Sequence, residues 1–237
     1  MIKISERLKT AASMVHEGNR LADVGTDHGY VPIYLLQQGR IPRAIAMDIN
    51  RGPLDRAEEH IALYQLENYI ETRLSDGVEA LNAGEADTIL IAGMGGGLVM
   101  HILTDGETVC RQAKELVLQP QSELERVRRF LFENGYVVDE EAMVKEDGKY
   151  YPMMRVHYEE NLADKQPEAS QVQLCYGKML LEQRHPVLFD YLNWERSIQE
   201  AILQKLRMQA QNEAILERIC EVEQVLAQNG EALAYYR

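Results

Sequence analysis

The sequence alternates between short apolar runs and longer segments in which apolar residues recur every three or four positions. The short runs predict strands and the longer segments predict helices. Strands that alternate with helices are typical of a parallel sheet covered on both faces. The predicted strands are 20–24, 43–48, 69–74, 87–92 and 115–119 and, after one more helix, 135–138 and 150–158, which have no helix between them.

Several connections between these strands have recognisable signals. Ser5 is expected to cap a helix that ends at Gly18, and Ser122 or Gln121 is expected to start the helix after the fifth strand. The segment between Leu103 and Glu115 has no clear periodicity and is expected to be irregular. An acidic loop that contains Asp147-Gly148 is expected to join the last two strands, which predicts a seven-stranded sheet with an antiparallel strand at its edge.

The composition changes after residue 160. A polar segment at 163–173 predicts a linker between a first domain at 1–160 and a helical domain at 161–237. Apolar residues repeat at spacings of three and four in two sets, 188–205 and 215–226, with a polar gap between them. We expect two helices folded into an antiparallel coiled coil, with one continuous helix that dimerises as the alternative.

The first predicted strand leads into a glycine loop, Gly25-Thr-Asp-His-Gly29, and then into a helix. This order is typical of a nucleotide-binding unit, whose ligand lies at the carboxyl end of the strand. A dinucleotide site would favour a second glycine where this loop has Asp27, and a carboxylate there would repel a pyrophosphate. A ligand with an ammonium and a sulfonium group suits it better, which points to S-adenosylmethionine. The alternative is that Asp23 or Asp27 only caps the helix.

Other strand ends carry further candidates. Asp48 closes the second strand about 20 residues after the glycine turn, where a carboxylate can accept hydrogen bonds from ribose hydroxyls. Asp76-Gly77 follows the third strand and is placed to contact adenine, although Asp-Gly is also a common turn. The run Gly93-Met-Gly-Gly-Gly97 follows the fourth strand and would let a flat substrate approach the backbone; a flexible turn is the alternative.

Bulk properties narrow the class of protein. The net charge of −13 argues by itself against nucleic-acid binding, but residues 1–56 are net positive, with 8 basic and 6 acidic side chains. No apolar stretch approaches the roughly 18 residues that span a membrane, so no membrane association is expected. The three cysteines form neither a metal-binding pattern nor an even disulfide set, so we expect no metal site and reduced thiols in the cytoplasm.

The motifs together resemble the bacterial tRNA (adenine(22)-N(1))-methyltransferases of the TrmK family over nearly the whole chain. The resemblance rests on Ile4-Ser-Glu-Arg-Leu8, Asp23-Val-Gly-Thr-Asp-His-Gly-Tyr30, Met47-Asp-Ile-Asn50, Ser75-Asp-Gly77, Ala92-Gly-Met-Gly-Gly96, Gln119-Pro120, Tyr176-Gly177 and Arg184-His-Pro186. One departure is Gln121, where members of this family are expected to carry Asn. The resemblance implies a Rossmann-like seven-stranded class I methyltransferase domain followed by the helical coiled coil.

The resemblance also implies a set of site residues. Methyl transfer is assigned to Asp27, Gly93, Met94 and Gly95. Binding of the tRNA base is assigned to Arg7, Gly95, Gly96, Gln119 and Pro120. Binding of S-adenosyl-L-methionine, and of S-adenosyl-L-homocysteine as product, is assigned to Arg7, Asp23, Gly25, Thr26, Asp27, His28, Gly29, Tyr30, Asp48, Ile49, Asn50, Asp76, Gly77, Gly93 and Met94.

The expected reaction needs no general base, because adenine N1 already has a lone pair. Catalysis would come mainly from orientation, with Asp27 stabilising the cationic product base. A small-molecule methyltransferase and an NAD-binding module are the alternatives.

A further expectation concerns the partner, tRNA. Basic residues of the tail and of the N-terminal section are expected to hold the tRNA over the glycine loops, and a monomer is favoured over a dimer. These residues are Lys178, Arg184, Arg196, Lys205, Arg207 and Arg218 in the tail, and Arg7, Lys9, Arg40 and Arg43 in the first section. A tail that only stabilises the fold or dimerises is the alternative.

Overall fold

The structure, a computed structural model, describes residues 2–161, 169–209 and 212–237. The chain divides into two compact units, Met1–Glu168 and Ala169–Arg237. The domain boundary expected at 160/161 remains a prediction, and most of the expected linker at 163–173 lies outside the described residues.

The first unit is built on a seven-stranded sheet in the order β3-β2-β1-β4-β5-β7-β6. Strands β1 to β5 pair in parallel, and β7 is antiparallel to both β5 and β6. The seven-stranded Rossmann-like fold is therefore confirmed, but the antiparallel strand lies one place in from the edge, because β7 returns between β6 and β5. The strands are β1 (Leu21–Val24), β2 (Ala44–Asp48), β3 (Ile70–Leu74), β4 (Thr88–Met94), β5 (Glu115–Pro120), β6 (Tyr136–Glu146) and β7 (Lys149–Tyr158).

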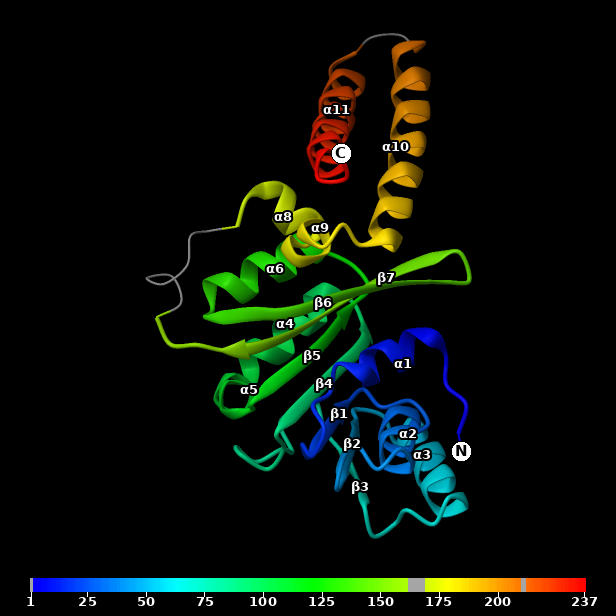
Figure 1. The fold of residues 1–237 in the computed structure, drawn as a ribbon, viewed down its shortest axis with the longest axis vertical. Helices are drawn as coiled ribbons and strands as arrows, with labels where there is room; N and C mark the ends of the chain where they lie inside the picture. The colour runs from blue at the N-terminus through cyan, green and yellow to red at the C-terminus, as the bar shows by residue number, and fades with distance from the viewer. Residues whose placement is uncertain (1, 162–168, 210–211) are drawn as a thin grey trace. The chain divides into compact units, whose positions relative to one another are not determined.

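Helices cover both faces of this sheet (Figure 1). Residues of α1, α2 and α3 form one apolar cluster with the sheet, and residues of α4, α5 and α6 form the other. Strand β4 contributes to both, since Ile89 and Ile91 belong to one cluster and Leu90 to the other. The helices are α1 (Glu6–Ser13), α2 (Tyr30–Gln37), α3 (Arg51–Leu63), α4 (Gly96–Asp105), α5 (Glu107–Gln112) and α6 (Leu124–Glu133).

The predicted start of α1 is confirmed and its predicted end is wrong. Ser5 Oγ accepts a hydrogen bond from Leu8 N at 3.3 Å. The helix ends at Ser13 rather than near Gly18, because Met14 and Val15 turn inward and are buried. The segment expected to be irregular before Glu115 contains α5.

The predicted cap of α6 is also wrong. This helix begins at Leu124, and its N-cap residue Glu123 has φ 54° and makes no side-chain cap bond. Instead Ser122 Oγ accepts from Gly96 N at 3.1 Å, and Glu123 Oε2 accepts from Gly97 N at 2.9 Å. Both side chains therefore cap α4 rather than the helix that they precede.

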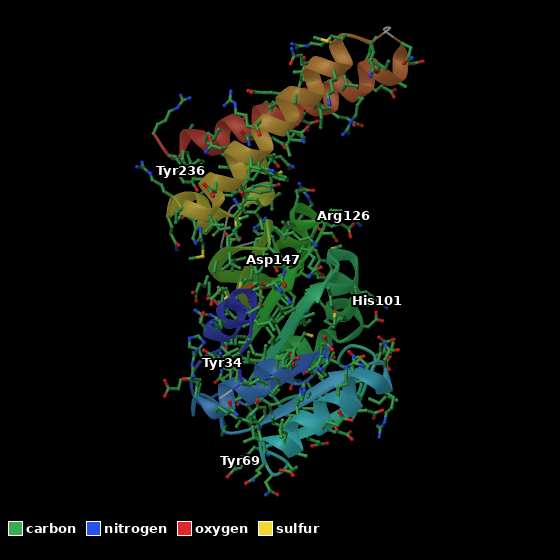
Figure 2. The ribbon with its side chains drawn as sticks, turned by 90° about the vertical axis from the view of Figure 1, so that its right-hand side faces the viewer. Tyr34, Tyr69, His101, Arg126, Asp147 and Tyr236 are labelled. Carbon is green, nitrogen blue, oxygen red and sulfur yellow. The ribbon has the colours of Figure 1, made fainter. Side chains whose placement is uncertain are left out.

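The acidic segment expected as a loop between the last two strands is mainly strand. β6 pairs with β7 as far as Glu146↔Lys149, which leaves Asp147 and Gly148 as the turn. Both residues have positive φ, 49° and 75°, as the type I′ turn of a two-residue hairpin requires. Asp147 is labelled in Figure 2. The β6–β7 pairing continues past Leu118↔Met154, the last pair between β5 and β7, so the hairpin extends beyond the carboxyl end of β5.

The second unit contains the predicted helical pair. Its helices are α8 (Gln171–Tyr176), α9 (Lys178–Glu182), α10 (Pro186–Arg207) and α11 (Glu213–Ala234). The continuous helix is excluded, because α10 ends at Arg207 and Asn212 Oδ1 caps α11 by accepting from Ile215 N at 3.0 Å. The two helices run antiparallel (Figure 1), with Arg207 bonded to Glu223 at 2.6 Å. Coiled-coil packing remains a prediction.

A polar cluster joins three helices of this unit. Glu195, which interrupts the apolar repeat of α10, accepts hydrogen bonds from the hydroxyls of Tyr176 (2.7 Å) and Tyr191 (2.8 Å) and from Asn229 Nδ2 (3.0 Å). Asn229 is completely buried. The cluster therefore fixes the register of α8, α10 and α11. None of the described helices is both long enough and apolar enough to cross a membrane.

Candidate functional site at the carboxyl ends of the strands

The predicted site residues converge because β1 to β5 are parallel, so the loops after these strands meet at one edge of the sheet. Strand β1 lies between β2 and β4, which places its glycine loop between the loops after those strands. The segments that meet there are Gly25–Gly29, Asp48–Asn50, Ser75–Gly77, Gly93–Gly97 and Gln119–Gln121.

The glycine loop has a backbone shape that few other residues tolerate. Gly25, His28 and Gly29 all have positive φ, at 73°, 62° and 66°. The N–H groups of Gly25 and Thr26 donate to Met47 O, both at 2.8 Å, so the loop is tied to the end of β2. A side chain at Gly25 would overlap the terminal methyl of Met94. The Met94 methyl therefore fills the space that a side chain at Gly25 would take.

Asp23 is a buried carboxyl group directly below this loop. Thr26 Oγ1 donates to Asp23 Oδ2 at 2.7 Å, and both residues are almost completely buried. Burial raises the pKa of Asp23 to about 6; the Thr26 hydrogen bond opposes this shift, and the charge of Asp48 adds to it. Such a group gains from a cationic ligand, which would compensate its buried charge. The helix-capping alternative fails for Asp23 and Asp27 alike, because the N-cap of α2 is Gly29.

Asp27 lies on the side of the loop that faces α3. Its side chain is 68% exposed, and its Oδ1 is 3.3 Å from Arg56 Nη2 and 3.2 Å from His28 Nε2. The His28 ring stacks on Tyr30 at a centroid distance of 5.0 Å, and both stack on His60 of α3. Asp27 thus lies beside α3, in contact with Arg56. The catalytic role expected for it remains a prediction.

The ends of β2 and β3 border a hollow of about 360 Å³. Ile49 and Leu74 line it with side chains that are 57% and 55% exposed, and Asp76 adds a carboxylate. Next to it, Asp48 Oδ1 accepts from Asn50 N at 2.7 Å. Glu79 also lines the hollow. An apolar floor beside the carboxylates of Asp48, Asp76 and Glu79 suits an adenine base attached to a ribose.

Two other hollows differ in their surroundings. One of about 190 Å³ lies between Asp76-Gly77 and α4 and is lined by His101 (Figure 2). Another of about 360 Å³ is lined by Arg20, Arg43 and Tyr69 at the amino ends of β1, β2 and β3. None of the residues assigned to the methyl donor or to the base lines this last hollow, and ligands of parallel sheets bind at the carboxyl ends, so it is not the candidate site. Arg43, expected to hold tRNA over the glycine loops, lines this hollow at the opposite edge of the sheet.

The glycine run after β4 divides into two parts. Gly93 and Gly95 are exposed, and Gly93 has φ 82°. Gly96 is buried: a side chain there would overlap Ser122 O and lie 2.9 Å from Val127 Cγ2. Gly93 and Gly95 therefore leave backbone open to a ligand, whereas Gly96 is needed for the packing of α4 against the turn after β5.

Gln119 and Arg7 form a network at the end of β5. Gln119 is completely buried, and its Oε1 accepts from Arg7 Nη1 at 2.8 Å and from Gly93 N at 3.2 Å. The Arg7 guanidinium also lies over the Tyr151 ring, 5.5 Å from its centroid. Pro120, the other predicted residue here, is buried at the end of the strand. The network holds a permanent cation at the rim of the β4 loop.

Sequence reasoning did not assign several residues of this edge. They are Arg56, His60, Ser122 and Tyr151, which contact predicted residues, and Gln121, whose Nε2 is 3.8 Å from the point where a side chain on Gly93 would begin. Only Gln121 had a local signal, its place after Gln119-Pro120. The part of the chain that the structure describes contains no cluster of His, Cys, Asp and Glu suited to a metal ion.

Comparison with known proteins gives consistent matches. Residues 4–154 match the family model for a methyltransferase domain. The tRNA (adenine(22)-N(1))-methyltransferase of Bacillus subtilis is 30% identical over 221 residues, which cover 93% of each chain.

Solved structures agree with these sequence matches. The crystal structure of the Bacillus subtilis m1A22 tRNA methyltransferase TrmK has a TM-score of 0.86 at 29% identity and covers 98% of this chain and all of the other. A Streptococcus pneumoniae relative solved in complex with S-adenosyl-L-methionine has a TM-score of 0.81 at 30% identity, over 94% of this chain and all of the other.

Proposed function

The chain belongs to the family of bacterial tRNA (adenine(22)-N(1))-methyltransferases, and from this membership we propose that it transfers a methyl group from S-adenosyl-L-methionine to N1 of adenine 22 in tRNA. The observation that carries the proposal furthest is the pairing of buried Asp23 with the bare backbone of Gly25. A buried carboxyl group below an open loop fits a cationic, phosphate-free ligand and disfavours NAD.

The residues of the edge fit the parts of the methyl donor. Asp23 and the Gly25 loop would hold the methionine portion, Asp48 the ribose, and Ile49 with Asp76 the adenine. When bound, the donor supplies an electrophilic methyl group on a sulfonium. The Met94 methyl fills the space beside Gly25, so a ligand seated against Gly25 would require Met94 to turn away.

The chain's own contribution to the reaction is orientation and electrostatics. Adenine N1 needs no base to become a nucleophile, so no residue has to remove a proton. The open backbone at Gly93 and Gly95 admits the flat base beside the donor site, and holding N1 in line with the methyl group supplies most of the acceleration. Taking the base out of its stack in folded tRNA costs a few kcal/mol, which contacts to the RNA must offset.

The direct test is mass spectrometry of the nucleosides, and of RNase fragments that locate the modified one, from tRNA incubated with the enzyme and methyl donor. We expect 1-methyladenosine at position 22 and calorimetric binding of S-adenosyl-L-homocysteine but not of NAD. Asp48→Ala should weaken that binding by roughly 1–3 kcal/mol, because ribose hydroxyls lose their charged acceptor. Binding of the product without methylation of any tRNA would instead favour a small-molecule methyltransferase.

The proposal extends to the state of the protein in the cell. We expect a monomer, because α10 and α11 pack against each other within one chain, and a cytoplasmic location, where tRNA is modified. Analytical ultracentrifugation checks the first expectation and cell fractionation the second.

A further inference from the structure

The two glutamines at the end of β5 have opposite surroundings. Gln119 is completely buried, and its oxygen accepts hydrogen bonds from Arg7 and from the backbone of Gly93. Gln121 is exposed. The carboxamide that a ligand can reach is therefore that of Gln121, while Gln119 positions Arg7 and the β4 loop.

Gln121 borders the open part of the β4 loop. Its backbone N donates to Met94 O at 2.8 Å, which ties the turn after β5 to the glycine run. Its side-chain Nε2 lies 3.8 Å from the point where a side chain on Gly93 would begin, and Arg7 Nη1 lies 3.6 Å from the same point. A flat base admitted over Gly93 would thus meet the amide of Gln121 at its edge.

Adenine presents two edges to such an amide. Its N6 amino group and N7 form a donor–acceptor pair that a glutamine carboxamide matches with two hydrogen bonds. This pairing leaves N1 free, whereas pairing through N6 and N1 would occupy the atom to be methylated. Guanine presents O6 and N7, two acceptors, so the same amide cannot satisfy both.

We propose that Gln121 is the specificity-determining residue for the target base, and that it pairs with N6 and N7 of the adenine to be methylated at N1. The inference rests on the proposed function and names how that site selects its base. The buried Gln119 does not contact the base in this arrangement. It is a positioning residue that holds the Gly93 backbone and the Arg7 guanidinium beside Gln121.

The test compares two tRNA transcripts that carry either adenosine or 7-deazaadenosine at the target position. The 7-deaza base replaces N7 with C–H and keeps N1 and N6. The full-length wild type is assayed beside Gln121→Ala and a matched control, Gln112→Ala, which removes an exposed amide from the end of α5 before the amino end of β5. For each protein we measure kcat/KM, tRNA affinity by fluorescence anisotropy, and melting temperature.

We expect the 7-deaza base to lower kcat/KM about tenfold for the wild type and for Gln112→Ala. Gln121→Ala should be slow with adenosine, should lose nothing further with 7-deazaadenosine, and should keep its melting temperature. An equal loss for all three proteins, or none for the wild type, would overturn the role of Gln121 and leave the proposed function standing. No methylation of the adenosine transcript by the wild type would overturn the proposed function itself.

Discussion

Gly96 must be a glycine for packing, a role that the glycine run in the sequence does not reveal. A methyl group at this position would overlap Ser122 O and press on Val127, where α4 packs against the turn after β5. We expect Gly96→Ala to lower the free energy of unfolding by about 1–3 kcal/mol. Chemical denaturation measures it, with Gly230→Ala as the control.

Gly230 lies inside α11 with nothing within 4 Å of the added methyl, so its replacement should raise stability by about 0.5–1 kcal/mol. An unchanged free energy of unfolding for Gly96→Ala would contradict the prediction, because it would mean that the turn at Ser122 moves aside without destabilising the protein.

Asp23 links stability to pH. Its pKa rises from 3.8 to about 6 on folding, so the native state binds a proton more readily than the unfolded chain between these values. Stability therefore falls as pH rises from about 4 to about 6. The side chain of Asp23→Asn cannot ionise, so this pH dependence is lost. The free energy of unfolding of the variant minus that of the wild type should therefore increase by about 1 kcal/mol from pH 5 to pH 7.5.

Urea unfolding at the two pH values checks this prediction. Calorimetry should show weaker binding of S-adenosyl-L-homocysteine by the variant, which separates the role in binding from the effect on stability. A difference from wild type that is the same at both pH values would contradict the prediction.

Single residues could be predicted from the sequence where the evidence for them lies in adjacent positions. The glycine loop and Asp48 could be found because each follows a strand end. The role of Gln119 could not, since its partner Arg7 is 112 residues away, and Gly96 depends on Ser122, 26 residues away. A contact between distant segments leaves no spacing in the sequence.

At the scale of elements, one buried ion pair joins α6 to β6. Arg128 Nε and Glu141 Oε1 are 2.9 Å apart, with side chains 6% and 1% exposed. Removing Glu141 takes this ion-pair partner from a guanidinium that stays buried, so Glu141→Leu should cost about 3–5 kcal/mol. The double variant Arg128→Leu/Glu141→Leu should recover most of the loss. Thermal unfolding of both variants is the measurement, and equal losses would show that packing rather than charge holds the two elements.

Strands were the elements that the sequence predicted best, because buried parallel strands form continuous apolar runs. Helix starts were predicted less well: Ser5 caps its own helix, but Ser122 and Glu123 cap α4 instead of α6. Glu195 is a polar residue in register with the apolar repeat of α10. It proves to be the centre of a hydrogen-bonded cluster whose partners come from α8 and α11.

At the scale of the whole molecule, the proposed function requires a protein of net charge −13 to bind tRNA, a polyanion. Three of the tail arginines pair with tail carboxylates: Arg196 with Glu200, Arg207 with Glu223, and Arg218 with Glu221. In the first unit, Arg40 donates instead to backbone carbonyls of Ala12 and Val15. Exposed pairs are worth little, so phosphates can replace the carboxylates at small cost.

We therefore predict that removal of residues 161–237 leaves binding of the methyl donor nearly intact and raises KM for tRNA at least tenfold, with a shallower dependence of binding on salt. Circular dichroism and ultracentrifugation establish that the remaining unit is folded and monomeric. Full efficiency of that folded monomer on tRNA would leave the tail with a structural role only.

The position of β1 between β2 and β4 also sets an order of events during synthesis. β1 ends at Val24, and one of its two neighbours does not begin until Thr88. At about 5–20 residues per second, the ribosome needs several seconds to make the stretch between them. Throughout that time one side of β1 has no partner strand, and exposed strand edges attract other chains. The nascent chain is thus most vulnerable to aggregation before β4 emerges. The glycine loop Gly25–Gly29 gains the neighbouring run Gly93–Gly97 only after that.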